Sequence, residues 1–309
     1  MTKYPGTYST KKGGVQGSNL VAVVLFICCI AMAFNMILGR SDVSPTVPSN
    51  PVNGGEGSSN SSSGPDTVDI DDASFRDAIV LGQYTTVSSS EEEGRRENLR
   101  LATEAINGIV IKPGETFSFN NTVGDYEQDE RYQLAPVVNE GAILYGRGGG
   151  VCQVTSALYM AALYTDLRIV ERHPHTTVVD YISIGLDATV VYGHKDLRLA
   201  NDSESPLMIK AESEGQTVTV SIIGQPLADG LQIKPVAELV EFHSAGTPLP
   251  NNIEWDSDLY YSTFYIVDSY REYFSHGTET DTVLLSRDIY IVLNDTTVQM
   301  PEGSTESVK

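Results

Sequence analysis

An apolar run near the N-terminus limits where a chain like this can fold. Residues 20–38 (LVAVVLFICCIAMAFNMIL) carry no charged side chain, and a helix of this length crosses a hydrocarbon core of roughly 30 Å. Three lysines precede the run, so the positive-inside rule keeps residues 1–19 cytoplasmic and places the rest outside. The run therefore predicts a transmembrane signal anchor. A cleaved signal peptide is the alternative, because Ala31-Met32-Ala33 resembles a small-x-small cleavage site.

Charge and composition change sharply beyond the apolar run. Four of the 20 basic residues and none of the 41 acidic residues lie in the first 40 positions. The acidic remainder should repel nucleic acid and anionic lipid, so we expect no nucleic-acid partner. Residues 39–74 are rich in Ser, Gly and Pro and predict a flexible linker. Cys152 is the only cysteine beyond the apolar run, which excludes an intrachain disulfide there.

Periodicity predicts two helices followed by strands. Ser88–Ser90 and three glutamates predict a capped helix start, Leu99, Ala102 and Ile106 share one face, and Gly108 can end this helix. A second helix should run from Gly150 or Cys152 to about Tyr164. Strands are predicted at 109–111, 116–119, 168–171, 176–182, 188–192, 207–212, 217–223, 262–273 and 282–293.

The order of these elements predicts an α+β fold, with the helices packed on a mostly antiparallel sheet. The first folded domain should cover 75–224. A small β module and a tail, 225–309, should follow it, because this part contains strand candidates but no convincing helix.

A cysteine, a histidine and an aspartate follow one another in a catalytic order. Cys152 lies at a predicted helix start, where the helix dipole favours a thiolate. His175 and Asp187 lie on or beside predicted strands downstream, the chain order of papain-like and transglutaminase-like enzymes. Two alternatives stay open: Cys152 as a buried small hydrophobe, and a zinc site made by Cys152, His173, His175 and Asp187.

Residues around this set predict contacts with a substrate. Gly149 and Gly150 leave the approach to Cys152 free of side chains, so a substrate or a neighbouring backbone can come close. Glu171 and Arg172 lie beside His173, and the guanidinium of Arg172 could orient a carboxylate substrate. A salt-bridged strand end is the alternative for this second group. No cofactor and no resident metal are expected.

Several segments resemble the hallmark segments of the VanW family. They are KPGETFSFNNTVG, GGGVCQVTSALYMAAL, ERHPHTTVVDY and GLDATVVYG, in the family's order over about 80–224. SYREYFSHGTETDTVLLSRDIY is similar to the small β module, sometimes G5-like, that follows this domain in other members. The motif residues matched by position are Gly149, Gly150, Cys152, Gln153, Glu171, Arg172, His175, Asp187 and Asp196. The family's tyrosine-asparagine pair is Tyr159-Met160 in this chain.

The resemblance implies a bacterial cell-envelope protein of a family named after a gene of glycopeptide-resistance clusters. It assigns no established role to any motif residue. The enzyme hypothesis makes Cys152 the nucleophile, His175 the base and Asp187 its orienting partner in amide hydrolysis or acyl transfer on peptidoglycan peptides. Gly149, Gly150, Gln153, Glu171, Arg172 and His173 would then contact the substrate. The alternative is a protein without catalytic activity that binds cell-wall peptide or glycan, or a scaffold that recruits another envelope protein. The expected partners are peptidoglycan and, through the N-terminal helix, the membrane.

Overall fold

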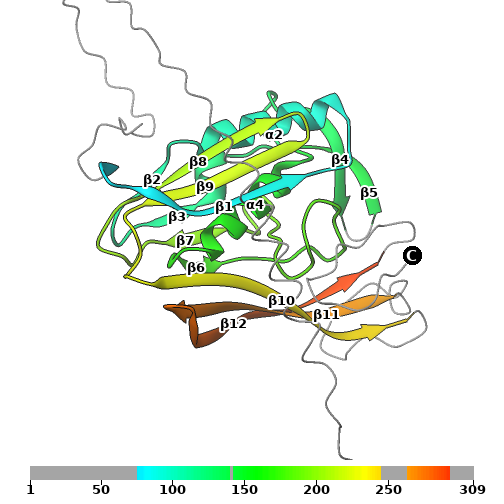
Figure 1. Cartoon of the computed structure of the whole chain (residues 1–309). Coiled ribbons are helices and arrows are strands. Elements are labelled where there is room, and N and C mark those ends of the chain that lie inside the picture. The colour runs from blue at the N-terminus through cyan, green and yellow to red at the C-terminus, as the bar shows by residue number, and fades with distance from the viewer. Residues whose placement is uncertain (1–74, 140–141, 245–262, 293–309) are drawn as a thin grey trace, which may run out of the picture. The chain divides into compact units, whose positions relative to one another are not determined.

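The computed structural model describes residues 75–139, 142–244 and 263–292 (Figure 1). All of them belong to one compact unit, Ser62–Lys309. The predicted anchor and linker lie outside the described residues, as does most of the predicted tail. Within the described ranges, no helix is long and apolar enough to cross a membrane.

A four-stranded antiparallel sheet with the order β1-β9-β8-β2 forms one layer of the molecule. The bounds are β1 Ile79–Val87, β2 Val110–Ile111, β8 Leu207–Glu214 and β9 Thr217–Gly224. Gly82 lets β1 approach the helix packed behind it, because a Cβ there would lie 2.2 Å from the carbonyl oxygen of Ala161. The sheet thus supports the helix that carries Cys152.

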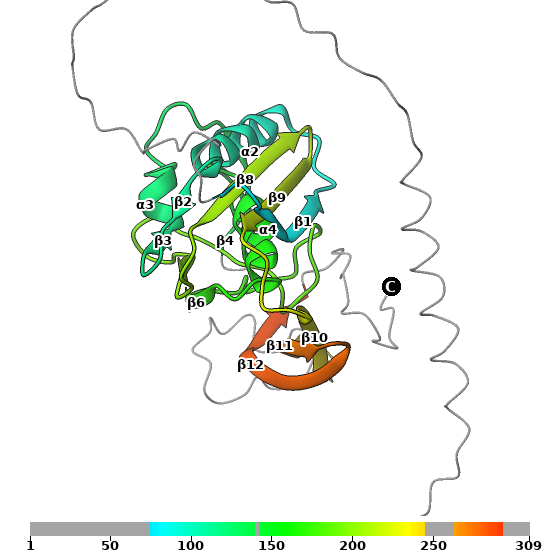
Figure 2. The same ribbon diagram turned by 60° about the vertical axis from the view of Figure 1, so that its left-hand side comes forward.

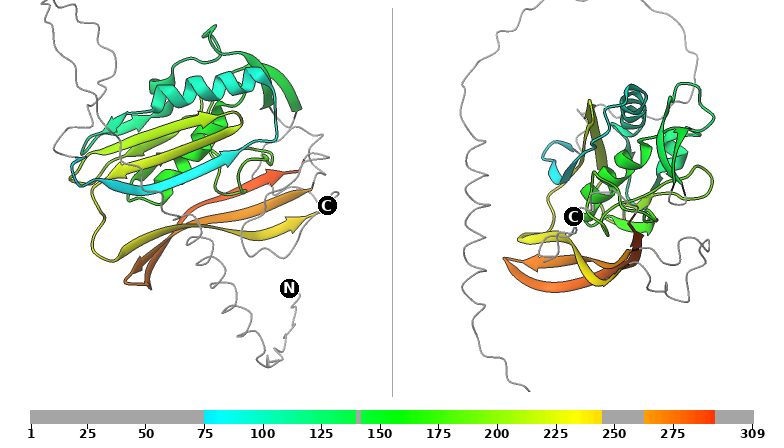
Figure 3. Two further views of the ribbon diagram at one scale, coloured as in Figure 1. Left: turned by 45° about the horizontal axis from the view of Figure 1, so that its top comes forward. Right: turned by 90° about the vertical axis from the view of Figure 1, so that its right-hand side faces the viewer.

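Helices α2 (Glu93–Ile106) and α4 (Val151–Leu163) cover the same face of this sheet (Figure 3). Leu99, Ala102 and Ile106 of α2 are buried as the periodicity predicts. Twelve of the residues of α4 are buried, so the helix runs through the core rather than over the surface. The prediction of this second helix is confirmed to within about one residue at each end.

The serines before α2 do not cap it. The helix begins at Glu93, and its N-cap residue, Glu92, makes no side-chain capping bond. Ser89 instead donates its backbone N–H to Asp180 at 2.7 Å, and the hydroxyl of Ser88 donates to the same carboxylate. The predicted cap was wrong because the helix begins three residues after Ser90, which places the serines outside the N-cap position.

Two small antiparallel sheets and a short helix complete the part up to Gly224. The order β3-β7-β6 forms one sheet, and β4 pairs with β5 in a hairpin. The bounds are β3 Thr116–Ser118, α3 Phe119–Val123, β4 Leu134–Asn139, β5 Ala142–Arg147, β6 Arg168–Glu171 and β7 Arg198–Ala200. Phe117 and Leu199 from the second sheet join the same hydrophobic core as α4.

A three-stranded sheet formed by β10 (Leu231–His243), β11 (Phe264–Ser275) and β12 (Thr278–Ile291) comes next in the chain (Figure 2). We call it the C-terminal sheet. The buried Arg271 of β11 donates to the carbonyl oxygens of Ala162, Leu163 and Leu167 at 3.1–3.2 Å. It neutralises the negative end of α4 and ties the C-terminal sheet to it. The likeness of this sheet to a G5-like module stays a prediction.

Mostly antiparallel sheets with few helices confirm the coarse fold prediction. The predicted strands at 176–182 and 188–192 are wrong, because the segment 172–197 has only isolated bridges at Thr177 and Val191. Its β-branched side chains enter the core instead of a strand ladder: Val178 and Val190 are buried. This irregular segment carries two of the three predicted catalytic residues.

Candidate functional site

The glycines before Cys152 build the start of α4. Gly148 has a φ of 76° and Gly150 a φ of 113°, a region that favours glycine. Gly149 packs against β4, where a Cβ would lie 2.7 Å from the carbonyl oxygen of Pro136. The glycines therefore admit a turn and a neighbouring strand, and they place Cys152 in the first turn of the helix.

Backbone contacts fix the irregular segment over this helix start. The hydroxyl of Ser156 donates to the carbonyl oxygen of Ala188 and accepts the N–H of the same residue, both at 3.0 Å. The Cys152 Sγ then lies 3.4 Å from the Thr189 Oγ1 and 3.6 Å from the carbonyl oxygen of Val190. The thiol is therefore enclosed by this segment on one side.

Asp187 is the centre of a buried hydrogen-bond network. Its Oδ2 accepts the backbone N–H of His175 at 2.7 Å and the Nδ1 of the same residue at 2.5 Å. Its Oδ1 accepts from Arg172 Nη2 at 3.0 Å and from the hydroxyl of Tyr290 at 2.5 Å. Because an ionised carboxylate can only accept, the Nδ1 of His175 carries a proton. The Nε2 then faces the Tyr181 hydroxyl, 3.3 Å away, and the Cys152 side.

The three groups shift one another's pKa. Burial opposes ionisation of Cys152, yet the hydrogen bond and charge of His175, with Thr189 and Val190, lower its pKa to about 7. Burial lowers the pKa of His175, but Asp187 and Cys152 outweigh this and raise it to about 9. Burial also opposes ionisation of Asp187, whereas the charge of Arg172 and the bonds from His175 and Tyr290 hold its pKa well below its usual range. The arrangement favours a thiolate–imidazolium pair near neutral pH.

A pocket of about 640 Å³ opens onto this pair. Cys152 and His175 line it together with Arg95 of α2 and Tyr126. The hairpin β4–β5 and the glycine turn 148–150 form another part of the lining. The reactive groups can therefore be reached by a ligand of the size of a short peptide.

The polar groups of Gln153 and Arg172 form hydrogen bonds and ion pairs with other groups of the protein. Gln153 accepts from Arg95 Nη2 at 2.9 Å and donates to the carbonyl oxygen of Gln216 at 2.8 Å, so it links α2, α4 and the β8–β9 turn. Arg172 forms ion pairs with Asp187 and Asp288 and also donates to the carbonyl oxygen of Asp187. Arg172 was predicted to orient a carboxylate of the substrate. In the structure its guanidinium pairs with two carboxylates of the protein itself and is almost fully buried.

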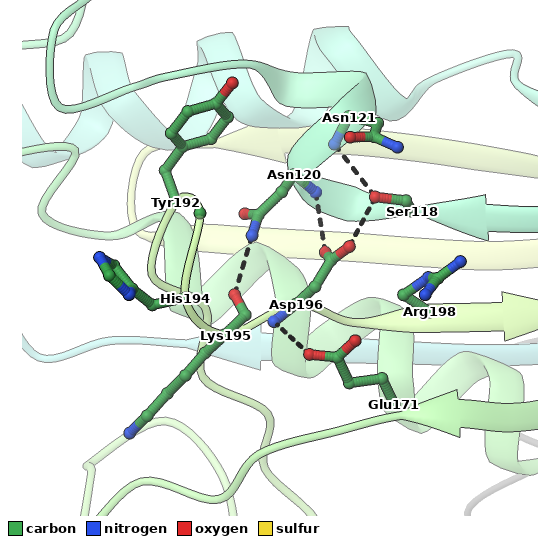
Figure 4. A pocket seen from close by; sticks show the side chains of 10 residues that line it. Ser118, Asn120, Asn121, Glu171, Tyr192, His194, Lys195, Asp196 and Arg198 are labelled. Carbon is green, nitrogen blue, oxygen red and sulfur yellow. Dashed lines mark hydrogen bonds between the residues drawn. The ribbon is translucent and has the colours of Figure 1, made fainter.

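Glu171 and His173 do not line the pocket that contains Cys152 and His175. They pair with each other at 2.9 Å, and Glu171 also accepts the N–H of Asp196 at 3.1 Å. Glu171 and Asp196 line a separate polar pocket, shown in Figure 4, whose lining includes neither Cys152 nor His175. There Asp196 accepts from the Ser118 hydroxyl at 2.5 Å and from the N–H of Asn120 at 2.9 Å, which fixes the loop over α3.

The zinc alternative lacks a ligand set in the described part of the chain. No three His, Cys, Asp or Glu side chains gather there in a way that could hold a metal ion. His173 faces Glu171, while Asp187 is saturated by protein donors. The residues expected to be zinc ligands are therefore divided between two places.

The sequence reasoning missed four side chains at the site: Arg95, Tyr181, Asp288 and Tyr290. Tyr290 and Asp288 come from β12, more than a hundred positions after Asp187, so no spacing rule points to them. The one available signal was the polar pair Asp288 and Tyr290 in a run of strand-forming residues. The C-terminal sheet therefore contributes directly to the network around Asp187.

Comparison with known proteins identifies the family that the part of the chain around Cys152 resembles. The family model described as VanW like protein matches residues 94–223, which include all three residues of the set. Residues 94–223 therefore form a VanW-like domain within the chain. The chain is 39% identical over 142 residues to the uncharacterized protein YoaR of Bacillus subtilis (46% of this chain, 47% of that protein). It is 35% identical over 159 residues to the vancomycin B-type resistance protein VanW of Enterococcus faecalis (50% of this chain, 56% of that protein).

The matches cover one domain rather than whole proteins. The chain spans about half the length of each of these two relatives. No solved structure matches the chain. The shared VanW-like domain contains Cys152, His175 and Asp187, whereas Asp288 and Tyr290 lie outside the matched range.

Proposed function

We propose that the VanW-like domain is a cysteine-dependent hydrolase or acyltransferase that acts on amide bonds. The observation that carries the proposal is the imidazole of His175, held by Asp187 on one side and interacting with the Cys152 thiol on the other. A core cysteine without function would need neither a charged partner nor a pocket. Both are present here, since the pocket of about 640 Å³ opens onto the thiol.

Each residue of the set has its own task in the reaction. The Cys152 thiolate attacks the carbonyl carbon of a substrate amide and forms a tetrahedral intermediate. The His175 imidazolium donates its proton to the leaving nitrogen, so the amine departs and an acyl-thioester stays on Cys152. A water molecule, or an acceptor amine in a transferase, then gives its proton to His175 and attacks the thioester. The carboxylate of Asp187 keeps the imidazole in the required orientation and stabilises its charged form.

The helix start supplies a donor for the negative oxygen of the intermediate. The N–H groups of Val151 and Gln153 bond to the carbonyl oxygens of Gly148 and Gly150. Among the turn, loop and cap hydrogen bonds between backbone groups of the described residues, none is donated by the N–H of Cys152. Together with the positive end of the α4 dipole, this N–H can stabilise an oxyanion formed beside the sulfur.

The substrate we assign is the peptide part of peptidoglycan, outside the membrane. The name of one relative, a vancomycin resistance protein, connects the family with cell-wall antibiotics and supports this choice. The apolar run 20–38 would anchor the chain, and the residues between 39 and 74 would let the α+β domain reach the wall. The acidic remainder of the chain fits an amide substrate better than a polyanionic one.

Digestion of purified sacculi tests the proposal. The full chain in detergent is incubated with sacculi, and released peptides and new amino groups are measured by mass spectrometry. We expect release by the wild type and by Cys28→Ala, and none by Cys152→Ala. Equal release by Cys152→Ala would refute the assignment. Sedimentation of an inactive chain with sacculi would instead support the alternative of a wall-binding protein without catalysis.

A further inference from the structure

Arg95 is a buried cation that the proposed mechanism does not use. It lies on α2 with only 8% of its surface exposed, and it lines the same pocket as Cys152 and His175. Its Nη2 donates to the Gln153 side chain at 2.9 Å. Its Nε is buried and has no hydrogen-bond partner, and no carboxylate of the described residues forms an ion pair with it.

The other two buried arginines of this region, Arg172 and Arg271, have acceptors for their guanidinium groups. Arg172 pairs with the carboxylates of Asp187 and Asp288, and Arg271 donates to three carbonyl oxygens at the end of α4. Burial of a charge without a partner is costly, so buried guanidinium groups are normally paired. Arg95 has one neutral amide and a tyrosine ring, with its Cζ 5.8 Å from the ring centroid of Tyr181. Neither supplies a countercharge.

The free donor lies close to the reacting groups. Tyr181 contacts both sides, because its hydroxyl is 3.3 Å from the His175 Nε2 while its ring packs against the Arg95 guanidinium. One aromatic ring therefore separates the guanidinium from the catalytic imidazole. An anion bound to Arg95 would therefore lie in the same pocket as an amide attacked by Cys152.

We propose that Arg95 binds a carboxylate of the substrate near the scissile amide. This inference rests on the proposed function and names the substrate class: peptides with an acidic group near the bond that is cleaved. A planar guanidinium matches the two oxygens of a carboxylate, and Gln153 holds it in place from behind. A single positive charge matches a carboxylate better than a doubly charged phosphate. The carboxylate can be the peptide's own C-terminus or an acidic side chain.

Two pairs of alkylating reagents test the inference without knowledge of the natural substrate. In the first pair, N-iodoacetylglycine carries a terminal carboxylate and N-iodoacetylglycinamide is its neutral analogue. In the second pair, N-iodoacetylaspartic acid α-amide carries the carboxylate on a side chain, and N-iodoacetylasparagine α-amide is neutral. The full chain is treated with each reagent at pH 7.5, and the rate of alkylation of Cys152 is followed by peptide mapping.

We expect at least one acidic reagent to alkylate Cys152 about tenfold faster than its neutral analogue. The pair that shows the preference identifies the source of the carboxylate. Arg95→Met should reduce the ratio of the acidic to the neutral rate to about one, whereas Arg95→Lys, which keeps the charge, should retain part of the preference. Arg96→Met is the matched control, because Arg96 is the next residue on α2 and is exposed. It should keep the preference.

The failures of the two proposals look different. Alkylation without preference for either acid, or a preference that survives in a folded Arg95→Met protein, overturns the role of Arg95 while Cys152 stays a reactive thiol. If Arg95→Met does not fold, Arg95→Lys takes its place. A preference in Arg95→Lys that is as large as in the wild type and in Arg96→Met then overturns the role of Arg95. Absence of alkylation by all four reagents refutes a reactive Cys152 and, with it, both proposals.

Discussion

The pH dependence of Cys152 alkylation reports directly on its pairing with His175. The pKa of the thiol lies at about 7 in the structure, against an ordinary value of 9.0. Replacement of His175 by Gln removes the hydrogen bond and the charge that lower it, while burial continues to raise it. We therefore expect an inflection near pH 7 in the wild type and at or above pH 9 in His175→Gln.

The size of the effect depends on two opposing factors. At pH 7 about half of the wild-type thiol is ionised, against about 1% in the variant, which gives about 50-fold more thiolate. A thiolate of lower pKa is a weaker nucleophile. With a Brønsted slope of about 0.45, the pKa difference of about two units makes the wild-type thiolate about eightfold less reactive than that of the variant. The wild type should thus react about sixfold faster at pH 7, whereas the variant, with a pKa of about 9, should react faster above about pH 8.

Alkylation by iodoacetamide between pH 5 and pH 11, resolved by peptide mapping, measures both curves. Residue resolution is needed because Cys28 and Cys29 are also thiols. The wild-type and variant curves should cross. Curves that coincide, or that never cross and share an inflection near pH 9, would refute the ion pair and leave Cys152 as an ordinary core cysteine.

Three further perturbations test the surroundings of the site. Tyr290→Phe removes a donor to Asp187 and the acceptor of the buried Gly185 N–H but keeps the ring, so we expect a several-fold slower release of peptides from sacculi, a higher Cys152 inflection and a stability loss of about 1–3 kcal/mol. Gly149→Ala places a Cβ against β4 and should destabilise the fold by about 1–3 kcal/mol in urea titration; no loss would contradict the close packing. Arg271→Met removes a donor from three carbonyls, of which that of Ala162 keeps a partner in Thr165, and should cost about 2–4 kcal/mol; Arg168→Met, which breaks an exposed pair, should change little.

The amide-cleaving activity should have a bell-shaped pH profile. The thiolate of Cys152 appears as pH rises through about 7, and the proton of His175 is lost as pH rises through about 9. Only the range between these values contains both the nucleophile and the acid, so release from sacculi should peak near pH 8. A rate that rises steadily up to pH 10 would contradict His175 as the proton donor.

Local signals predicted the parts of the site that local structure controls. The run that follows the glycines predicted a helix from Gly150 or Cys152 to about Tyr164, and α4 covers Val151–Leu163. The apolar face with Leu99 predicted α2, since burial of one face decides that helix. The order of Cys152, His175 and Asp187 predicted a set that the structure brings together.

Other parts depend on contacts between distant segments and could not be predicted in this way. The segment 172–197 has strand-like composition, yet its backbone forms scattered contacts instead of a ladder: with the Ser156 hydroxyl, with Ile291 at the end of β12, and between Thr189 and His173. The role of Arg172 depends on Asp288 in β12. Gln153 and Glu171, as motif residues, and His173, as their neighbour in the sequence, were predicted to contact the substrate, whereas their hydrogen bonds are made with groups of the protein.

A covalent intermediate on Cys152 tests the central claim most directly. The full chain is mixed with purified peptidoglycan stem peptides, quenched in acid within seconds, and examined by intact-protein mass spectrometry and peptide mapping. We predict an added acyl mass on the peptide that contains Cys152 in the wild type and its absence in Cys152→Ala. Release of peptides without any such adduct, or an equal adduct in Cys152→Ala, would contradict a catalytic cysteine in this domain.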